Sequence, residues 1–127
     1  PQRYCDLANA GKLPKRDNFW YGTSVTGKGA PLFATSVDFN TFLSIEPLME
    51  NLEAGLGSFG GVRWVIVGAM TGPGSKQHQP KREWVGNIVE AAGLTHAAVF
   101  MKDSLAPIWG DDLIRDHPDG MVWPEVK

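Results

Sequence analysis

Two charged residues at the ends of apolar runs are the best candidates for chemistry in this chain of 127 residues. Glu46 ends one run just before Pro47, and Lys102 ends another directly after Met101. A carboxylate and an ammonium in such positions can transfer a proton or anchor a charged ligand. The alternative is that the two side chains pair with each other or extend into solvent.

Four short apolar runs predict the β-strands that would position these residues, over residues 19–25, 41–46, 62–68 and 96–101. Two of them, over residues 41–46 and 62–68, are rich in β-branched and aromatic residues and stop at proline or glycine, which is typical of strands buried on both faces of a parallel sheet. Helices are expected over residues 4–10, 31–37, 48–56 and 80–92, with Gly93 as the residue after the last of these, and a short helix near residues 111–115.

The alternation of strands and helices predicts an α/β fold of parallel βα repeats, with the strands in chain order. Four such units suffice for a small open sheet or for about half of a TIM-like barrel. We take residues 1–127 as a single βα domain that belongs to a larger barrel, with residues 104–127 as an irregular tail. Half a barrel would leave strand edges and an apolar inner face uncovered, so we expect a homo-oligomer.

The period of two along a strand places several polar residues on one face of the sheet, at its carboxyl edge. The predicted rim consists of Ser24, Glu46, Gly68 and Lys102, and Ser44 shares the same face of the second strand with Glu46. The floor below them would be apolar and consist of Trp20, Phe42, Ile66 and Phe100. In α/β folds ligands bind at the carboxyl ends of parallel strands, so this edge is the predicted site.

A glycine-rich loop over residues 68–76 follows the third strand and contains Thr71 and Gly72. Its backbone N–H groups could bind an anion. The loop has neither the spacing of a P-loop nor that of the dinucleotide fingerprint, so a tight turn without a ligand is the alternative.

The composition excludes several classes of protein. The net charge of −2 gives no global basic surface for nucleic acid, and no apolar run is long enough to span a membrane. Cys5 is the only cysteine, which allows no internal disulfide and indicates a reducing, cytoplasmic compartment. The three histidines have no metal-ligand spacing, so we expect no metal site.

Three segments in this order resemble one known family: residues 19–25, the run Ser44-Ile45-Glu46-Pro47-Leu48, and residues 64–68 followed by Thr71-Gly72-Pro73-Gly74. Together they resemble the C-terminal half of a phage- and bacteria-encoded family of radical-SAM-like proteins of unknown function. The likeness covers residues 18–103. The family commonly has Gly-Glu-Ser where this chain has Ala69-Met70-Thr71.

The resemblance implies a partial TIM-like barrel that binds S-adenosylmethionine beside a [4Fe–4S] cluster. Three cysteines of an N-terminal loop hold the cluster in such families, so we expect none on this chain alone. The implied cofactor-binding residues are Ser24, Ser44, Gly68, Thr71 and Gly72. The implied catalytic residues are Glu46 and Lys102.

The leading hypothesis is therefore the C-terminal part of a radical-SAM-like protein, which contributes to a pocket for S-adenosylmethionine or substrate and is catalytically incomplete alone. Its partner would be the N-terminal half of the same protein, and nucleic acid is a partner by family analogy only. The alternatives are a non-enzymatic α/β module that binds an anion or nucleotide, and an assembly domain.

Overall fold

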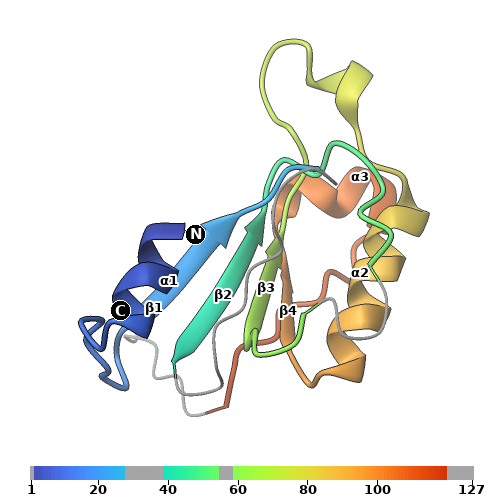
Figure 1. Ribbon diagram of the computed structural model, residues 1–127. Coiled ribbons are helices and arrows are strands. Elements are labelled where there is room, and N and C mark those ends of the chain that lie inside the picture. The colour runs from blue at the N-terminus through green and yellow to red at the C-terminus, as the bar shows by residue number, and fades with distance from the viewer. Residues whose placement is uncertain (1, 28–38, 55–58, 120–127) are drawn as a thin grey trace, which may run out of the picture.

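The structure is a computed structural model that describes residues 2–27, 39–54 and 59–119 (Figure 1). Its centre is a sheet of four strands: β1 (Trp20–Ser24), β2 (Asn40–Ile45), β3 (Trp64–Val67) and β4 (Ala98–Met101). The strands lie in the order β1-β2-β3-β4, and each neighbouring pair is parallel. The predicted α/β fold of parallel βα units is confirmed, and so is the predicted chain order of the strands.

The two faces of the sheet differ in burial. Along β2, Leu43 and Ile45 are fully buried, whereas Phe42 and Ser44 between them are half-buried. The same alternation holds in β3 and β4. The buried face packs against Val85, Ile88, Ala91 and Ala92 of α2 (Arg82–Leu94) in one hydrophobic core.

We call the opposite face the aromatic face. It consists of Trp20, Gly22, Ser24, Phe42, Ser44, Trp64, Ile66 and Phe100.

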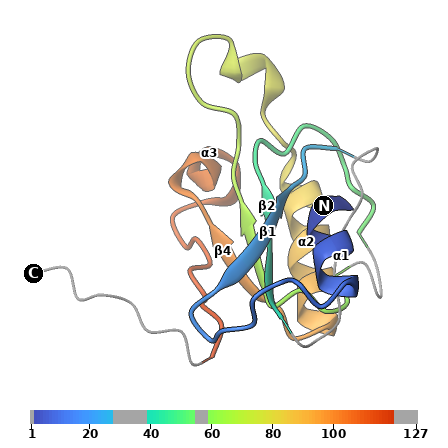
Figure 2. The same cartoon turned by 60° about the vertical axis from the view of Figure 1, so that its left-hand side comes forward.

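Helices lie on both sides of the sheet (Figure 2). α1 (Gln2–Asn9) and α2 lie on the side of the buried face, and α3 (Ala106–Trp109) lies on the other side. Two short 3₁₀ turns, η1 (Ser75–His78) and η2 (Asp103–Leu105), follow β3 and β4. α1 and α2 correspond to the predicted helices over residues 4–10 and 80–92, and the helix predicted over residues 31–37 lies outside the described residues.

The helix predicted over residues 48–56 is wrong for the part that the structure describes. Residues 46–54 are irregular, although Leu48 and Leu52 are both buried as the helical spacing required. The backbone N–H of Glu53 donates to the side chain of Asn51, and Glu53 has a φ of 53°. An asparagine side chain that satisfies the backbone two residues later favours a turn over a helix.

The short helix predicted near residues 111–115 is also wrong. Arg115 instead forms an antiparallel bridge with Phe100 of β4, and α3 lies earlier in the chain than the predicted helix. The tail after residue 103 therefore begins with η2 and α3, followed by an extended segment along β4.

Gly93 does not follow α2 as predicted but lies within its last turn. The left-handed position falls three residues later, at His96 with a φ of 58°. The backbone N–H groups of Thr95 and Ala97 both donate to the carbonyl of Ala92. These bonds satisfy the carbonyl of Ala92 at the end of α2, although the residue with the left-handed backbone is a histidine and not a glycine.

Candidate functional site

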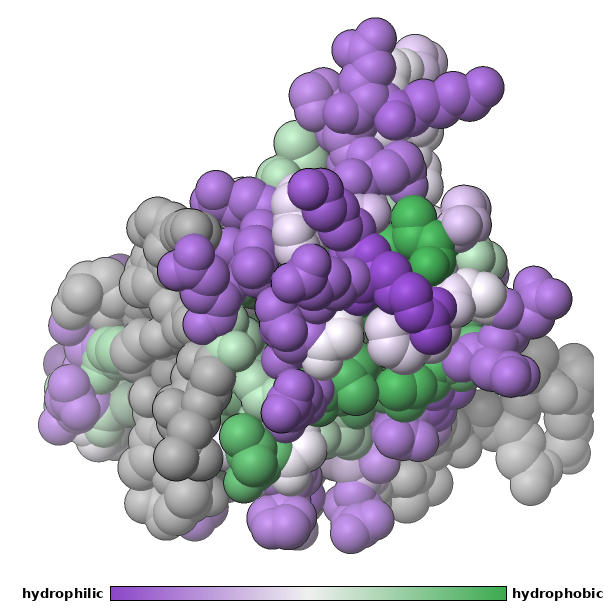
Figure 3. All heavy atoms as spheres, turned by 90° about the vertical axis from the view of Figure 1, so that its right-hand side faces the viewer, coloured by the Kyte–Doolittle hydropathy of each residue, from purple (hydrophilic) through white to green (hydrophobic). Residues whose placement is uncertain are grey.

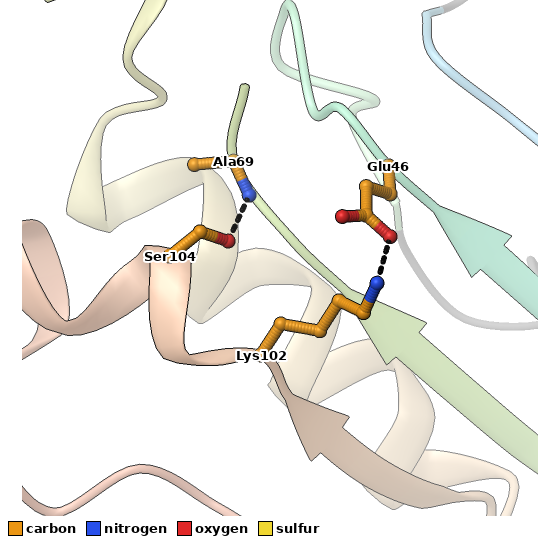
Figure 4. A network of polar contacts seen from close by, with 4 residues as sticks. All are labelled: Glu46, Ala69, Lys102 and Ser104. Carbon is orange, nitrogen blue, oxygen red and sulfur yellow. Dashed lines mark hydrogen bonds and ion pairs between the residues drawn. The ribbon is translucent and has the colours of Figure 1, made fainter. Parts of the chain in front are cut away.

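The carboxyl edge of the sheet brings together the two residues predicted to carry chemistry. The Nζ of Lys102 donates to Oε2 of Glu46 at 2.6 Å, across the end of β3 (Figure 4). The side chains are 30% exposed at Glu46 and 46% exposed at Lys102. The two residues form an ion pair, which was one of the two alternatives expected from the sequence. Both side chains remain partly exposed, so a ligand can reach them.

Parallel pairing of the backbone places this ion pair. The N–H of Gly68 donates to the carbonyl of Ile45 at 3.0 Å, and the N–H of Lys102 donates to the carbonyl of Val67 at 2.9 Å. The sheet register therefore continues past the strand ends, and Glu46, Gly68 and Lys102 form one row across three strands.

Gly68 makes room for the carboxylate. A Cβ at this position would lie 3.0 Å from Cδ and 3.1 Å from Cγ of Glu46. The Glu46 side chain thus crosses β3 over a residue that has no side chain. Gly68 therefore influences the ion pair only by leaving room for the Glu46 side chain, and we call it a positioning residue.

We expect Gly68→Ala to uncouple Glu46 from Lys102. The half-exposed pair should have a coupling energy of about 0.5–1 kcal/mol in a double-mutant cycle of Glu46→Gln and Lys102→Met. The new methyl group moves the carboxylate, so the same cycle in the Gly68→Ala background should give a value near zero. Urea unfolding of the unmodified chain and the seven variants measures both cycles.

Gly86→Ala is the matched control for this substitution. A Cβ at Gly86 of α2 would meet no atom within 4 Å, so alanine there should stabilise the helix by roughly 0.5–1 kcal/mol and leave the coupling unchanged. An unchanged coupling energy in Gly68→Ala would show that Gly68 does not position Glu46.

The row below the ion pair contains the two predicted serines. Ser24 pairs with Ser44 in the register of β1 and β2, and Ser44 pairs with Ile66. Ser24 is exposed and Ser44 is half-buried. The structure thus places both hydroxyl-bearing residues on the aromatic face, one row from Glu46 and Lys102.

Trp64 is the centre of the aromatic face. Its ring centroid lies 6.1 Å from that of Trp20, 6.4 Å from that of Phe42 and 6.3 Å from that of Phe100. These are edge-on or tilted contacts, the geometry that aromatic pairs prefer. The predicted apolar floor is therefore present below the polar edge.

Part of this floor is covered by residues 113–118, which we call the crossing segment. The ring of His117 lies 5.8 Å from Trp64 and 5.6 Å from Phe100, and the indole N–H of Trp64 donates to the carbonyl of Asp116. The guanidinium of Arg115 lies 4.8 Å from the centre of the Phe100 ring. The covered part lies over β3 and β4. No motif in the sequence pointed to these contacts.

Ser104 is a residue of the edge that the sequence did not single out. Its hydroxyl oxygen accepts a hydrogen bond of 2.9 Å from the backbone N–H of Ala69 (Figure 4). This bond ties the chain after β3 to η2, next to Lys102. A lone serine three residues after a strand carries no recognisable signal, because its partner is 35 residues away.

Thr71 and Gly72, the two other predicted cofactor-binding residues, are not brought to this row. They are exposed in the loop between β3 and η1, which projects beyond the carboxyl edge (Figure 1). The projecting part is covered by hydrophilic side chains (Figure 3), among them exposed Lys76, Gln77 and His78. A role for the loop in ligand binding stays a prediction.

A broad hollow of about 800 Å³ lies at the opposite, amino edge of the sheet. Gly61–Arg63 before β3, the end of α2 and residues 116–119 line it. Ligands of parallel α/β sheets bind at the carboxyl edge, and the predicted site residues lie there. We therefore assign the candidate site to the carboxyl edge.

The described residues contain no cluster of three or more His, Cys, Asp or Glu side chains that could hold a metal ion. Cys5, the one cysteine of the sequence, is half-buried on α1. No described helix is both long and apolar enough to cross a membrane.

The comparison with known proteins places the chain in a family. Residues 1–113 match the family described as "Protein of unknown function (DUF5131)", which covers most of the chain. The protein therefore belongs to this family. No curated protein and no solved structure matches this chain.

Proposed function

We propose that the chain is the C-terminal βα part of a radical-SAM-like barrel, and that its carboxyl edge forms part of a pocket for S-adenosylmethionine or substrate. The proposal depends chiefly on one observation, the half-exposed Glu46–Lys102 pair above the aromatic face. Parallel strands in chain order, as in barrels, support it.

The chemistry of the edge fits the methionine end of S-adenosylmethionine, which carries an ammonium and a carboxylate. The free oxygen of Glu46 can accept from the ammonium, and the remaining N–H groups of Lys102 can donate to the carboxylate. Because Gly68 has no Cβ, the Glu46 side chain can lie across β3 toward Lys102, so that both charged groups can face one ligand. Such a ligand adds its two charges to the existing pair without breaking it.

Ser24 and Ser44 offer hydroxyl groups on the next row, and the half-buried rings below provide an apolar wall for a planar group. S-adenosylmethionine, when bound in an enzyme, supplies a methyl group or a carbon radical. The role of this chain would be to bind and orient it. Glu46 and Lys102 are also the groups able to hold or move a proton at the edge.

The cluster implied by the resemblance does not fit the residues of this chain. Three thiolates are needed to hold it, and the sequence contains Cys5 alone. Cluster chemistry would have to come from another polypeptide or segment, and no step of the proposed role depends on it.

Ligand titration by NMR tests the proposal. We expect S-adenosylmethionine to shift the backbone amide signals of Gly68 and Lys102, and Glu46→Gln and Lys102→Met each to weaken binding by about tenfold, or about 1.4 kcal/mol. Asp103→Asn is the matched control, because it removes a carboxylate from an ion pair with Arg115 outside the row. This variant should bind like the unmodified chain.

The same titration discriminates the second candidate, an anion- or nucleotide-binding module. The half-exposed ammonium of Lys102 favours that candidate. Adenosine monophosphate and inorganic phosphate would then bind at least as well as S-adenosylmethionine, and Glu46→Gln would not weaken binding. The absence of any shift at the edge with all these ligands would refute both candidates.

A further inference from the structure

The two edges of the sheet are not equivalent, because the edge at β4 is closed. The N–H of Met101 donates to the carbonyl of Ile114 at 2.7 Å, and the N–H of Asp116 donates to that of Val99 at 2.9 Å. The crossing segment thus pairs with β4 in the antiparallel direction. A further strand cannot add directly to β4 while this segment is in place.

The edge at β1 has no strand beside it among the described residues. The N–H of Val25 donates to the carbonyl of Ser44 on β2, and backbone groups alternate in direction along a strand. The N–H and C=O groups of Trp20, Gly22 and Ser24 therefore point away from β2. Figure 2 brings this side forward and shows β1 with no described helix or strand in front of it.

The sequence of β1 has none of the usual protections of an edge strand. Residues Trp20–Ser24 include no proline and no charged residue, and two of them are aromatic. Outward amides and carbonyls with this spacing are complementary to an extended polypeptide backbone. The chemistry of the edge thus defines its occupant as a β-strand.

The charges at the two ends of β1 are complementary in an antiparallel arrangement. Lys12, Lys15 and Arg16 are exposed before β1 together with one acidic residue, Asp17, so this end has a net positive charge. Glu50 lies at the other end, with its carboxylate in the space beside Gly27. Two antiparallel copies of β1 bring the basic end of each close to the acidic end of the other.

We propose that β1 pairs with β1 of a second copy of this chain, in antiparallel orientation about a two-fold axis at Gly22. This register pairs Trp20 with Ser24 of the partner subunit, so that every outward N–H and C=O of β1 is bonded. The two four-stranded sheets become one, and the two aromatic faces form a continuous surface. The inference goes beyond the proposed function and concerns residues 1–127 by themselves, because a strand from an N-terminal half of a barrel would occupy the same edge of β1 and exclude the second copy.

Light scattering over a concentration series, from one to about one hundred micromolar, tests the pairing with Ser24→Pro as the key variant. The N–H of Ser24 points outward, so proline removes a donor to the second copy and keeps the bonds between β1 and β2. We expect a dimer for the unmodified chain at tens of micromolar and a monomer for Ser24→Pro. Circular dichroism would confirm that the variant is folded.

Arg115→Pro is the matched control at the other edge. The bonds of Ile114 and Asp116 to β4 leave the N–H of Arg115 pointing away from the sheet, so proline there should not change the dimer. A monomer of the unmodified chain at one hundred micromolar would overturn the proposal. A dimer that persists in Ser24→Pro, or that Arg115→Pro dissociates, would also overturn it.

Discussion

Leu43→Ala is expected to lower the free energy of unfolding by about 2–5 kcal/mol, the range for removing a buried leucine side chain. Leu43 is fully buried at the centre of the sheet, among core residues that include Val65 and Ile88. The neighbouring structure can close such a cavity only in part, so the loss includes both transfer and cavity terms. Urea unfolding followed by circular dichroism measures the change.

Ser44→Ala is the control for this prediction, one residue further along the same strand. Its side chain lies on the half-buried aromatic face, and we expect a change within about 0.5 kcal/mol. The dependence of unfolding on urea concentration should have the same slope in both variants. Similar losses at the two positions would contradict the assignment of the two faces.

Gly22→Ala is expected to destabilise the protein by about 1–3 kcal/mol, the usual cost of overpacking. A Cβ at Gly22 would lie 2.2 Å from Cζ of Phe42, so the ring now occupies the space of the missing side chain. The ring would have to swing away and change its contact with Trp64. Urea unfolding at low micromolar concentration separates this effect from self-association.

A double-mutant cycle with Phe42→Ala identifies the cause. Once the ring is absent, the alanine at position 22 meets no overlap, so the double variant should lose less stability than the sum of the two single variants. Simple addition of the two losses would show that the ring is not the source of the strain. The loss in Gly22→Ala would then be a backbone effect of β1.

The strands and their faces were predictable from the sequence because the period of two along a strand is local information. Residues 41–46 alternate between apolar and mixed positions, and the structure assigns Leu43 and Ile45 to the core and Phe42 and Ser44 to the other face. The same alternation of side chains along the strands predicted that Glu46, Gly68 and Lys102 lie in one row. This part of the candidate site was therefore foreseen from residue spacing alone.

The irregular segments were not predictable in this way. The leucines at positions 48 and 52 fit a helical stripe, and both are buried, but a buried pair four residues apart can also belong to a turn. The Asn51 side chain and the left-handed backbone of Glu53 decided the outcome. Similarly, Arg115 follows no strand-like pattern, because its extended shape comes from the backbone of β4 rather than from its own neighbours.

By itself, the sequence determined the class of the fold, the order of the strands and the polar residues at their carboxyl ends, since these depend on local patterns of burial. Only the tertiary structure decided that Glu46 and Lys102, 56 residues apart, pair over Gly68. It also decided that the crossing segment closes the edge at β4, whereas the outer edge of β1 has no strand beside it among the described residues. The physical reason is that such contacts depend on strand register and on the space between distant segments. Local patterns of residues carry no information about either the register or this space.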